Sequence, residues 1–193
     1  MSVIRAFIAV ELSTGVQLSL QDVCSHLGSQ LKQLPVRLVP VKNIHLTLIF
    51  LGDVSVNNLE ALKNMLTAEA ANYHPFEIGV GQMGVFPSFR KPRVIWIGVQ
   101  APSELFSLQH RVEAETTRLG YPPEDRGFTP HLTVGRVSRN ASPGEVREIG
   151  EILETQKIEA LGIMKVESVN LYRSDLQPSG ALYTRIISAG LNA

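Results

Sequence analysis

The sequence contains only one cysteine, Cys24, so no disulfide can form within the chain. This indicates a reducing compartment, and we expect a cytoplasmic protein. An excess of charge of one sign is also lacking, because 18 Lys and Arg residues are balanced by 18 Asp and Glu residues. No net field therefore draws the protein to nucleic acid or to an anionic membrane, and an RNA substrate would have to be held by a local site.

Long apolar runs are missing as well. No segment approaches the roughly 18 apolar residues that span a bilayer, and the N-terminal stretch MSVIRAFIAVELSTG lacks the apolar region and cleavage site of a signal peptide. We therefore expect no membrane association, no obligate protein partner and a monomer. The hydrophobic content of 44% over 193 residues is sufficient for a sizeable core and excludes a mainly disordered chain.

Hydrophobic spacing predicts strands and helices that alternate along the chain. Ser13 or Thr14 is expected to cap the first helix and Ser103 the third. The last two strands flank the turn SDLQPSG and predict an antiparallel hairpin, so the expected class is α+β. The expected strands cover residues 3–10, 43–51, 76–86, 93–100, 128–137, 158–173 and 181–187, and the expected helices cover 16–34, 56–72, 104–119 and 143–155.

A short motif occurs twice, nearly half the chain length apart. It reads His45-Leu46-Thr47-Leu48 the first time and His131-Leu132-Thr133-Val134 the second, and each copy follows a strand and a helix. This loose duplication predicts one domain over residues 1–193 with two pseudo-equivalent lobes, each supplying one motif.

Each motif presents two polar groups on one surface of a strand. Side chains alternate between the faces of a strand, so His45 and Thr47 share one face, as do His131 and Thr133. The aliphatic residues between them anchor the opposite face. Threonine is stiff at χ1, so its hydroxyl is held with little loss of rotamer freedom.

Two such units that face each other have the parts needed for phosphoryl transfer. Two imidazoles that titrate near neutral pH form a general acid and base pair, and two threonine hydroxyls can donate to phosphate oxygens. Arg136 can add a bidentate contact to the phosphate. It follows His131 by five residues, an odd number, so it reaches the same face only if Gly135 marks a bulge or the strand end.

A zinc site is the competing use of the two histidines. Zinc takes three or four ligands, and no Asp, Glu or Cys adjoins either His45 or His131. We therefore expect no metal and no cofactor. A zinc hydrolase stays open as an alternative function, and inhibition by a chelator would indicate it.

Other residues have weaker claims to a functional role. One loop carries three cations that either touch RNA phosphates or are simply solvated: Arg90, Lys91 and Arg93. Strand alternation from His45 assigns Phe50 to the core face, and Trp96 is also expected in the core. Glu124 and Asp125 are expected to solvate their loop.

Several segments resemble the two-histidine phosphoesterase superfamily, and in particular the RNA 2′,3′-cyclic phosphodiesterases, also called 2′-5′ RNA ligases. The paired His-x-Thr-x motifs carry this resemblance, which covers nearly the whole chain. It is supported by the segments RAFIAVEL, FPSFRKPRVIWIGV, FTPHLTVGR and LYRSDLQPSGALYTRI. The resemblance implies a bilobal α+β fold with antiparallel-containing sheets around a central cleft and with helices on the outside.

The resemblance also implies a reaction. A terminal 2′,3′-cyclic phosphate would be hydrolysed to a 2′-phosphomonoester without a metal. His45 would donate a proton and His131 would accept one. Thr47, Thr133 and Arg136 would hold the phosphate. The reverse reaction would join 2′-5′ ends. Two alternatives stay open: a different small cyclic phosphate, such as a cyclic nucleotide or an ADP-ribose derivative, and a non-catalytic nucleotide-binding module.

Overall fold

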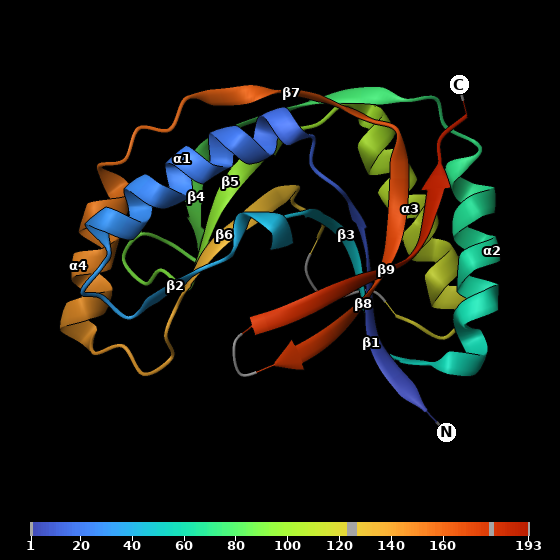
Figure 1. Cartoon of the computed structure of the whole chain (residues 1–193), viewed down its shortest axis with the longest axis horizontal. Coiled ribbons are helices and arrows are strands. Elements are labelled where there is room, and N and C mark those ends of the chain that lie inside the picture. Colours follow the sequence, from blue (N-terminus) through green and yellow to red (C-terminus); the bar gives the residue numbers. More distant parts are fainter. Residues whose placement is uncertain (1, 123–126, 178–179, 193) are drawn as a thin grey trace.

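The computed structural model describes residues 2–122, 127–177 and 180–192, so Glu124 and Asp125 lie outside the described residues. Strands and helices alternate along the described chain (Figure 1). The strands are β1 (Val3–Val10), β2 (Val36–Leu38), β3 (Leu46–Ser55), β4 (Phe76–Phe86), β5 (Val94–Gln100), β6 (His131–Val137), β7 (Ala160–Val166), β8 (Ser168–Gln177) and β9 (Gly180–Gly190). The helices are α1 (Thr14–Gln30), α2 (Leu59–Ala70), α3 (Ser103–Arg118) and α4 (Pro143–Glu154), with short 3-10 turns η1 (Val41–Asn43) and η2 (Val56–Asn58).

The strands of the described chain form one sheet in the order β7-β4-β5-β6-β3-β1-β8-β9, and β2 pairs with β6. The strand pairs are antiparallel, which confirms the predicted α+β class. Leu46 and Leu132 join β3 to β6 at the centre of this sheet. We call β3, β1, β8 and β9 the His45 half, and β7, β4, β5 and β6 the His131 half. A division into two pseudo-symmetric lobes stays a prediction.

The helices bury apolar stripes against the outer parts of the sheet. Helices α2 and α3 pack against each other beside the His45 half, while α1 lies against β7 (Figure 1). Leu20 and Leu27 of α1 and Leu62 and Leu66 of α2 are fully buried. Removing these side chains from water stabilises the fold by about 1.5–3 kcal/mol each. The helices thereby hold the central strands in place from outside.

Of the two predicted helix caps, that of α1 is correct and that of α3 is wrong. The Ser13 Oγ accepts the Val16 N–H at 3.4 Å and caps α1. Helix α3 instead has Pro102 as its N-cap, and no side chain caps it. Ser103 is the first residue of the helix, and its hydroxyl donates to the Glu104 carboxylate.

Helix α4 begins at the predicted residue, Pro143. It follows a capping box in which the side chains of Ser142 and Glu145 accept each other's backbone N–H groups. The fixed φ of proline suits the first helical position, where the missing N–H leaves no hydrogen bond unmade. The start of this helix is therefore fixed by three residues of local sequence.

Two predicted elements differ from the structure in length or number, and one observed strand was not predicted. The predicted strand 158–173 is two strands, because β7 pairs with β4 at one end of the sheet while β8 pairs with β1 in the His45 half. The first helix ends at Gln30, before the predicted end, because the chain turns so that β2 can pair with β6. Strand β2 was not predicted, since three residues carry no periodic signal.

Candidate active site

The two motifs cross at the centre of the sheet. Leu46 pairs with Leu132 in antiparallel register, and both side chains are fully buried. Continuing this register by one residue each way places His45 beside Thr133 and Thr47 beside His131. These four side chains lie on the face opposite the two leucines, which we call the motif face. The structure therefore brings together the four residues that the sequence singled out.

Both imidazoles are held in the same way. The Nδ1 of His45 lies 2.8 Å from the carbonyl oxygen of Asn43, and the Nδ1 of His131 lies 2.7 Å from the carbonyl oxygen of Thr129. A carbonyl can only accept a hydrogen bond, so Nδ1 carries the proton in both rings. Each Nε2 is then the atom that gains or loses a proton. The two rings therefore share one tautomer, with the proton on Nδ1.

Three aromatic rings surround His45, and we call Phe7, Tyr172 and Tyr183 the aromatic cluster. The Phe7 ring stacks on the imidazole at a centroid distance of 4.6 Å, Tyr172 stacks on Phe7 at 5.2 Å, and the centroids of Tyr172 and His45 lie 6.4 Å apart. Tyr183 meets the imidazole edge-on at 5.2 Å. Burial among these rings lowers the pKa of His45 from its ordinary value of 6.5, while the hydrogen bond to Asn43 acts in the opposite direction.

The aromatic neighbours of His131 are arranged differently. Phe86 and Trp96 both meet this ring edge-on, at centroid distances of 5.1 Å and 6.4 Å. Trp96 pairs with Thr133, which places the indole on the motif face. The assignment of Trp96 to the core was therefore wrong. One histidine is stacked face to face with a ring and the other is not, so the two imidazoles have distinct environments.

Arg136 reaches the motif face because of a β-bulge. One face of β5 carries Val94, Trp96 and Gly98. These residues pair in turn with Arg136, Thr133 and His131 of β6. The pairing shifts by one residue between Ile95 and Trp96, so an extra residue of β6 reverses the alternation.

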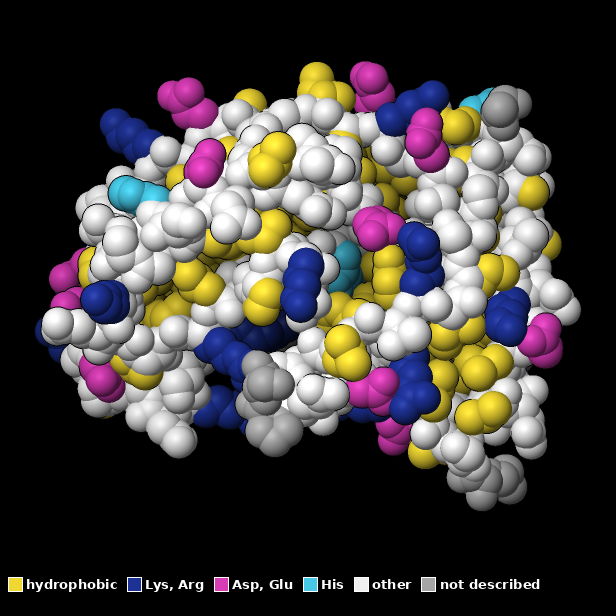
Figure 2. All heavy atoms as spheres, in the orientation of Figure 1, with side chains coloured by type: hydrophobic (Ala, Val, Ile, Leu, Met, Phe, Trp, Pro, Cys, Tyr) yellow, Lys and Arg dark blue, Asp and Glu magenta, His cyan; other side chains and the backbone are white. Residues whose placement is uncertain are grey.

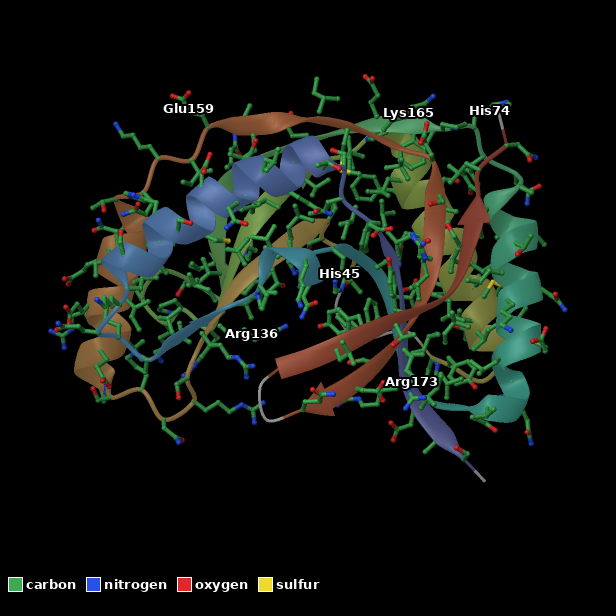
Figure 3. All side chains as sticks on the ribbon, in the orientation of Figure 1. His45, His74, Arg136, Glu159, Lys165 and Arg173 are labelled. Carbon is green, nitrogen blue, oxygen red and sulfur yellow. The ribbon has the colours of Figure 1, made fainter. Side chains whose placement is uncertain are left out.

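The positive charge of Arg136 acts on Tyr183 of the opposite half of the sheet. Burial raises the pKa of Tyr183, and the charge of Arg136 lowers it. In Figure 3 the guanidinium of Arg136 points toward the hairpin of β8 and β9. The cation therefore lies between the two halves.

The loop that carries Arg90, Lys91 and Arg93 leads away from the motif face. After Phe86 the chain leaves the site, and the backbone of Phe89 rests against Gly150 of α4. Arg93 donates from Nη1 to the carbonyl oxygen of Ser138 at 2.9 Å. Arg90 and Lys91 are exposed. An RNA contact by this loop stays a prediction.

A hollow opens beside His45. It has a volume of about 330 Å³ and is lined by the aromatic cluster, by two aliphatic side chains and by polar side chains: Phe7, Glu11, Gln17, Lys42, Asn43, Ile44, His45, Tyr172, Leu182, Tyr183 and Arg185. Figure 2 shows a histidine at the bottom of this hollow, where Figure 3 labels His45. Arg185 and Glu11 form an ion pair of 2.8 Å at its rim. The volume suits a small ligand or part of a larger one.

Sequence reasoning missed the aromatic cluster and misplaced Phe50. Phe7 and Tyr172 come from opposite ends of the chain, and no local signal links them to His45. Phe50 is 51% exposed instead of buried, because the register of β3 against β1 shifts once between Thr47 and Phe50. Phe7 and Ala9 share one face of β1 and pair with Phe50 and Thr47, so Phe50 lies on the motif face.

Within the described residues, no group of three or more His, Cys, Asp or Glu side chains is placed to hold a metal ion. Nor does any helix of that part of the chain have the length and apolar character needed to cross a membrane. The motif residues that could contact a metal ion are two histidines and two threonines, and threonine is a poor ligand for zinc.

The chain matches the family model of the 2′-5′ RNA ligase superfamily over residues 16–178. The chain belongs to this superfamily. It is 39% identical over 183 residues to the RNA 2′,3′-cyclic phosphodiesterase of Methanothermobacter thermautotrophicus, covering 94% of this chain and 95% of the relative. It is 33% identical over 179 residues to the protein of that name from Archaeoglobus fulgidus, covering 93% and 96%.

Solved structures share the fold of this superfamily member. TT0787 of Thermus thermophilus superposes with a TM-score of 0.80 at 26% identity, over 97% of this chain and 98% of that one. Escherichia coli LigT complexed with 3′-AMP superposes with a TM-score of 0.75 at 25% identity, over the whole of both chains. The resemblance seen in the sequence is confirmed at the level of family and fold.

Proposed function

We propose that this protein hydrolyses the 2′,3′-cyclic phosphate at an RNA end to a 2′-phosphomonoester, with the two motif histidines as acid and base. The observation that carries the proposal is the crossing of the two motifs, which presents two imidazoles with free Nε2 atoms on one face. The names of the two relatives support the substrate class.

The reaction needs one proton transfer at each imidazole. His131 Nε2 takes a proton from a water molecule as the water oxygen forms a bond to phosphorus. The bond between phosphorus and O3′ breaks, and His45 Nε2 gives its proton to O3′. The O2′ ester remains. These steps balance without a metal, and each histidine ends in the protonation state in which the other began.

The negative charge on the phosphoryl oxygens is stabilised by donors on the same face. In this proposal the hydroxyls of Thr47 and Thr133 donate to the non-bridging oxygens, and the guanidinium of Arg136 adds a charged donor. Run in reverse, with a 5′-hydroxyl taking the place of water, the site would join 2′-5′ ends, and the acid and base would exchange roles.

The lowered pKa of His45 bears on this assignment. A general acid must be protonated, whereas burial favours the neutral ring in the free protein. A bound phosphodiester brings a negative charge to Nε2, which raises the pKa of the imidazole. The bound substrate would therefore restore the proton affinity of His45 that burial in the aromatic cluster lowers. We further infer a single two-lobed domain that acts as a cytoplasmic monomer, in keeping with the single cysteine.

The decisive experiment uses an oligonucleotide with a 2′,3′-cyclic terminus and an excess of chelator. We expect hydrolysis that the chelator does not slow, with a 2′-phosphate as the product. His45→Gln and His131→Gln should each reduce kcat by roughly 10²- to 10⁴-fold. A dominant 3′-phosphate product would contradict the assigned roles, and inhibition by chelator would favour a zinc hydrolase.

His26→Gln provides a matched control. His26 is exposed on α1, where its Nε2 contacts Gln156 at 3.0 Å, away from the motif face. We expect this variant to keep full activity. If the motif variants retain turnover and only change nucleotide affinity, the protein is a binding module and not an enzyme.

A further inference from the structure

A row of side chains crosses the motif face next to His45. In register, Phe50 of β3 pairs with Phe7 of β1, Phe7 pairs with Tyr172 of β8, and Tyr172 pairs with Arg185 of β9. We call these four residues the aromatic row. The ring centroids of Phe7 lie 6.3 Å from Phe50 and 5.2 Å from Tyr172. The His45 half of the sheet thus presents neighbouring rings on one surface.

Phe50 is the exposed ring at one end of this row, and Arg185 is the exposed residue at the other end. Phe7 is only 4% exposed because it lies between the rings of His45, Phe50 and Tyr172. Phe50 is 51% exposed and covers Phe7 on one side only. The register shift between Ile8 and Ala9 turns its side chain from the core to this surface. A bulge that re-aims an apolar ring into water beside an active site favours a ligand over a packing role.

The direction of the substrate follows from the proposed acid. His45 protonates O3′, so the ribose of the terminal nucleotide lies on the side of His45. The preceding nucleotide is attached to that ribose and continues away from the phosphate, across the His45 half. Phe7 lies between the catalytic ring and Phe50, because it stacks on His45 at 4.6 Å and its ring centroid is 6.3 Å from that of Phe50. The exposed ring is therefore one step beyond the nucleotide that reacts.

We propose that Phe50 stacks on the base of the nucleotide that precedes the cyclic phosphate, so that the protein acts on RNA ends in preference to mononucleotides. This inference rests on the proposed function. Stacking on an aromatic side chain is tolerant of base identity, and single-stranded RNA is recognised in this way on sheet surfaces. It also explains how a chain without net positive charge holds an RNA end, because a ring contact needs no phosphate-binding patch.

The test compares two substrates that differ only in length. One is a mononucleotide 2′,3′-cyclic phosphate, and the other is a trinucleotide with the same terminal nucleotide. For Phe50→Ala we expect kcat/KM to fall roughly tenfold on the trinucleotide and to stay unchanged on the mononucleotide. Phe50→Tyr keeps a ring and should retain the trinucleotide activity. A trinucleotide without a base at the middle position should be cleaved equally by Phe50→Ala and the unaltered protein.

Phe106→Ala is the matched control, since Phe106 is 43% exposed on α3 and its ring contacts Phe128. Its ratio of trinucleotide to mononucleotide activity should equal that of the unaltered protein. Equal losses on both substrates in Phe50→Ala, or no loss on either, would overturn the inference while leaving the hydrolase intact. If the unaltered protein cleaves neither substrate, the proposed function is wrong and this inference is wrong with it. Thermal melting of each variant separates a lost contact from a lost fold.

Discussion

Replacing Gly84 with alanine should displace Trp96 toward the motif residues His131 and Thr133. Gly84 of β4 pairs with Trp96 of β5, and the indole lies flat on the glycine. A Cβ atom at position 84 would lie 2.7 Å from the indole Cε2 and closer still to Cζ2 and Cη2. The ring cannot rotate freely out of the way, because Phe86 lies 5.1 Å from it and His131 lies 6.4 Å from it on other sides.

The size of the effect follows from this overlap. Carbon atoms pack at about 3.5–4.0 Å, so the indole must retreat by roughly an ångström or more. Overpacking of this kind costs about 1–3 kcal/mol. For a chain of 193 residues, each kcal/mol lowers Tm by about 2–4 °C. Displacement toward Thr133, the other register partner of Trp96, should also reduce kcat.

Fluorescence and thermal melting measure both consequences. Trp96 is the single tryptophan of the chain, so its emission reports the position of this one ring. We expect an altered emission spectrum, a lower Tm and a lower kcat in Gly84→Ala. Gly79→Ala is the control on the same strand, because its Cβ would meet Gln100 at an ordinary contact distance of 3.4 Å.

One outcome would refute this reasoning directly. If Gly84→Ala has the same Tm and the same emission spectrum as the unaltered protein, the indole does not lie on Gly84. If Tm falls but emission and kcat stay unchanged, the strain is relieved by the strand and not by the ring. Trp96 would then have no connection to the geometry of His131.

Further predictions concern the site itself. In an NMR titration, His45 should titrate below its ordinary pKa and move upward when 2′-AMP binds, because the phosphate favours the imidazolium; no upward movement would remove the ring from the phosphate site. The same burial means that the unfolded chain binds this proton more readily, so folding stability should be lost as pH falls below about 6.5 toward the folded pKa, and His45→Gln should abolish that loss. Phe7→Leu should admit water to the imidazole and raise the pKa of His45, with a fall in kcat larger than any change in KM; an unchanged titration curve would contradict the stacking argument. Thr47→Val and Thr133→Val should each lower kcat by roughly 10- to 10³-fold with little change in Tm, and full activity in both would exclude the hydroxyls as phosphate donors.

Local chemistry in the sequence predicted much of the fold. Ser13 and Pro143 mark helix starts because capping and a fixed φ act within one turn. The final hairpin follows from two strands around a turn. The boundary at Glu167 could not be predicted, because β7 and β8 separate only through their different sheet partners.

The sequence by itself singled out the groups proposed to perform the chemistry, because the two His-x-Thr-x motifs specify an imidazole and a hydroxyl on one side of a strand wherever that strand lies. Only the tertiary structure decided how these groups meet and what surrounds them. The register of Leu46 with Leu132 joins the motifs, and register shifts turn Phe50 and Arg136 to the motif face. A register shift depends on the partner strand, so alternation counted along a single strand cannot detect it.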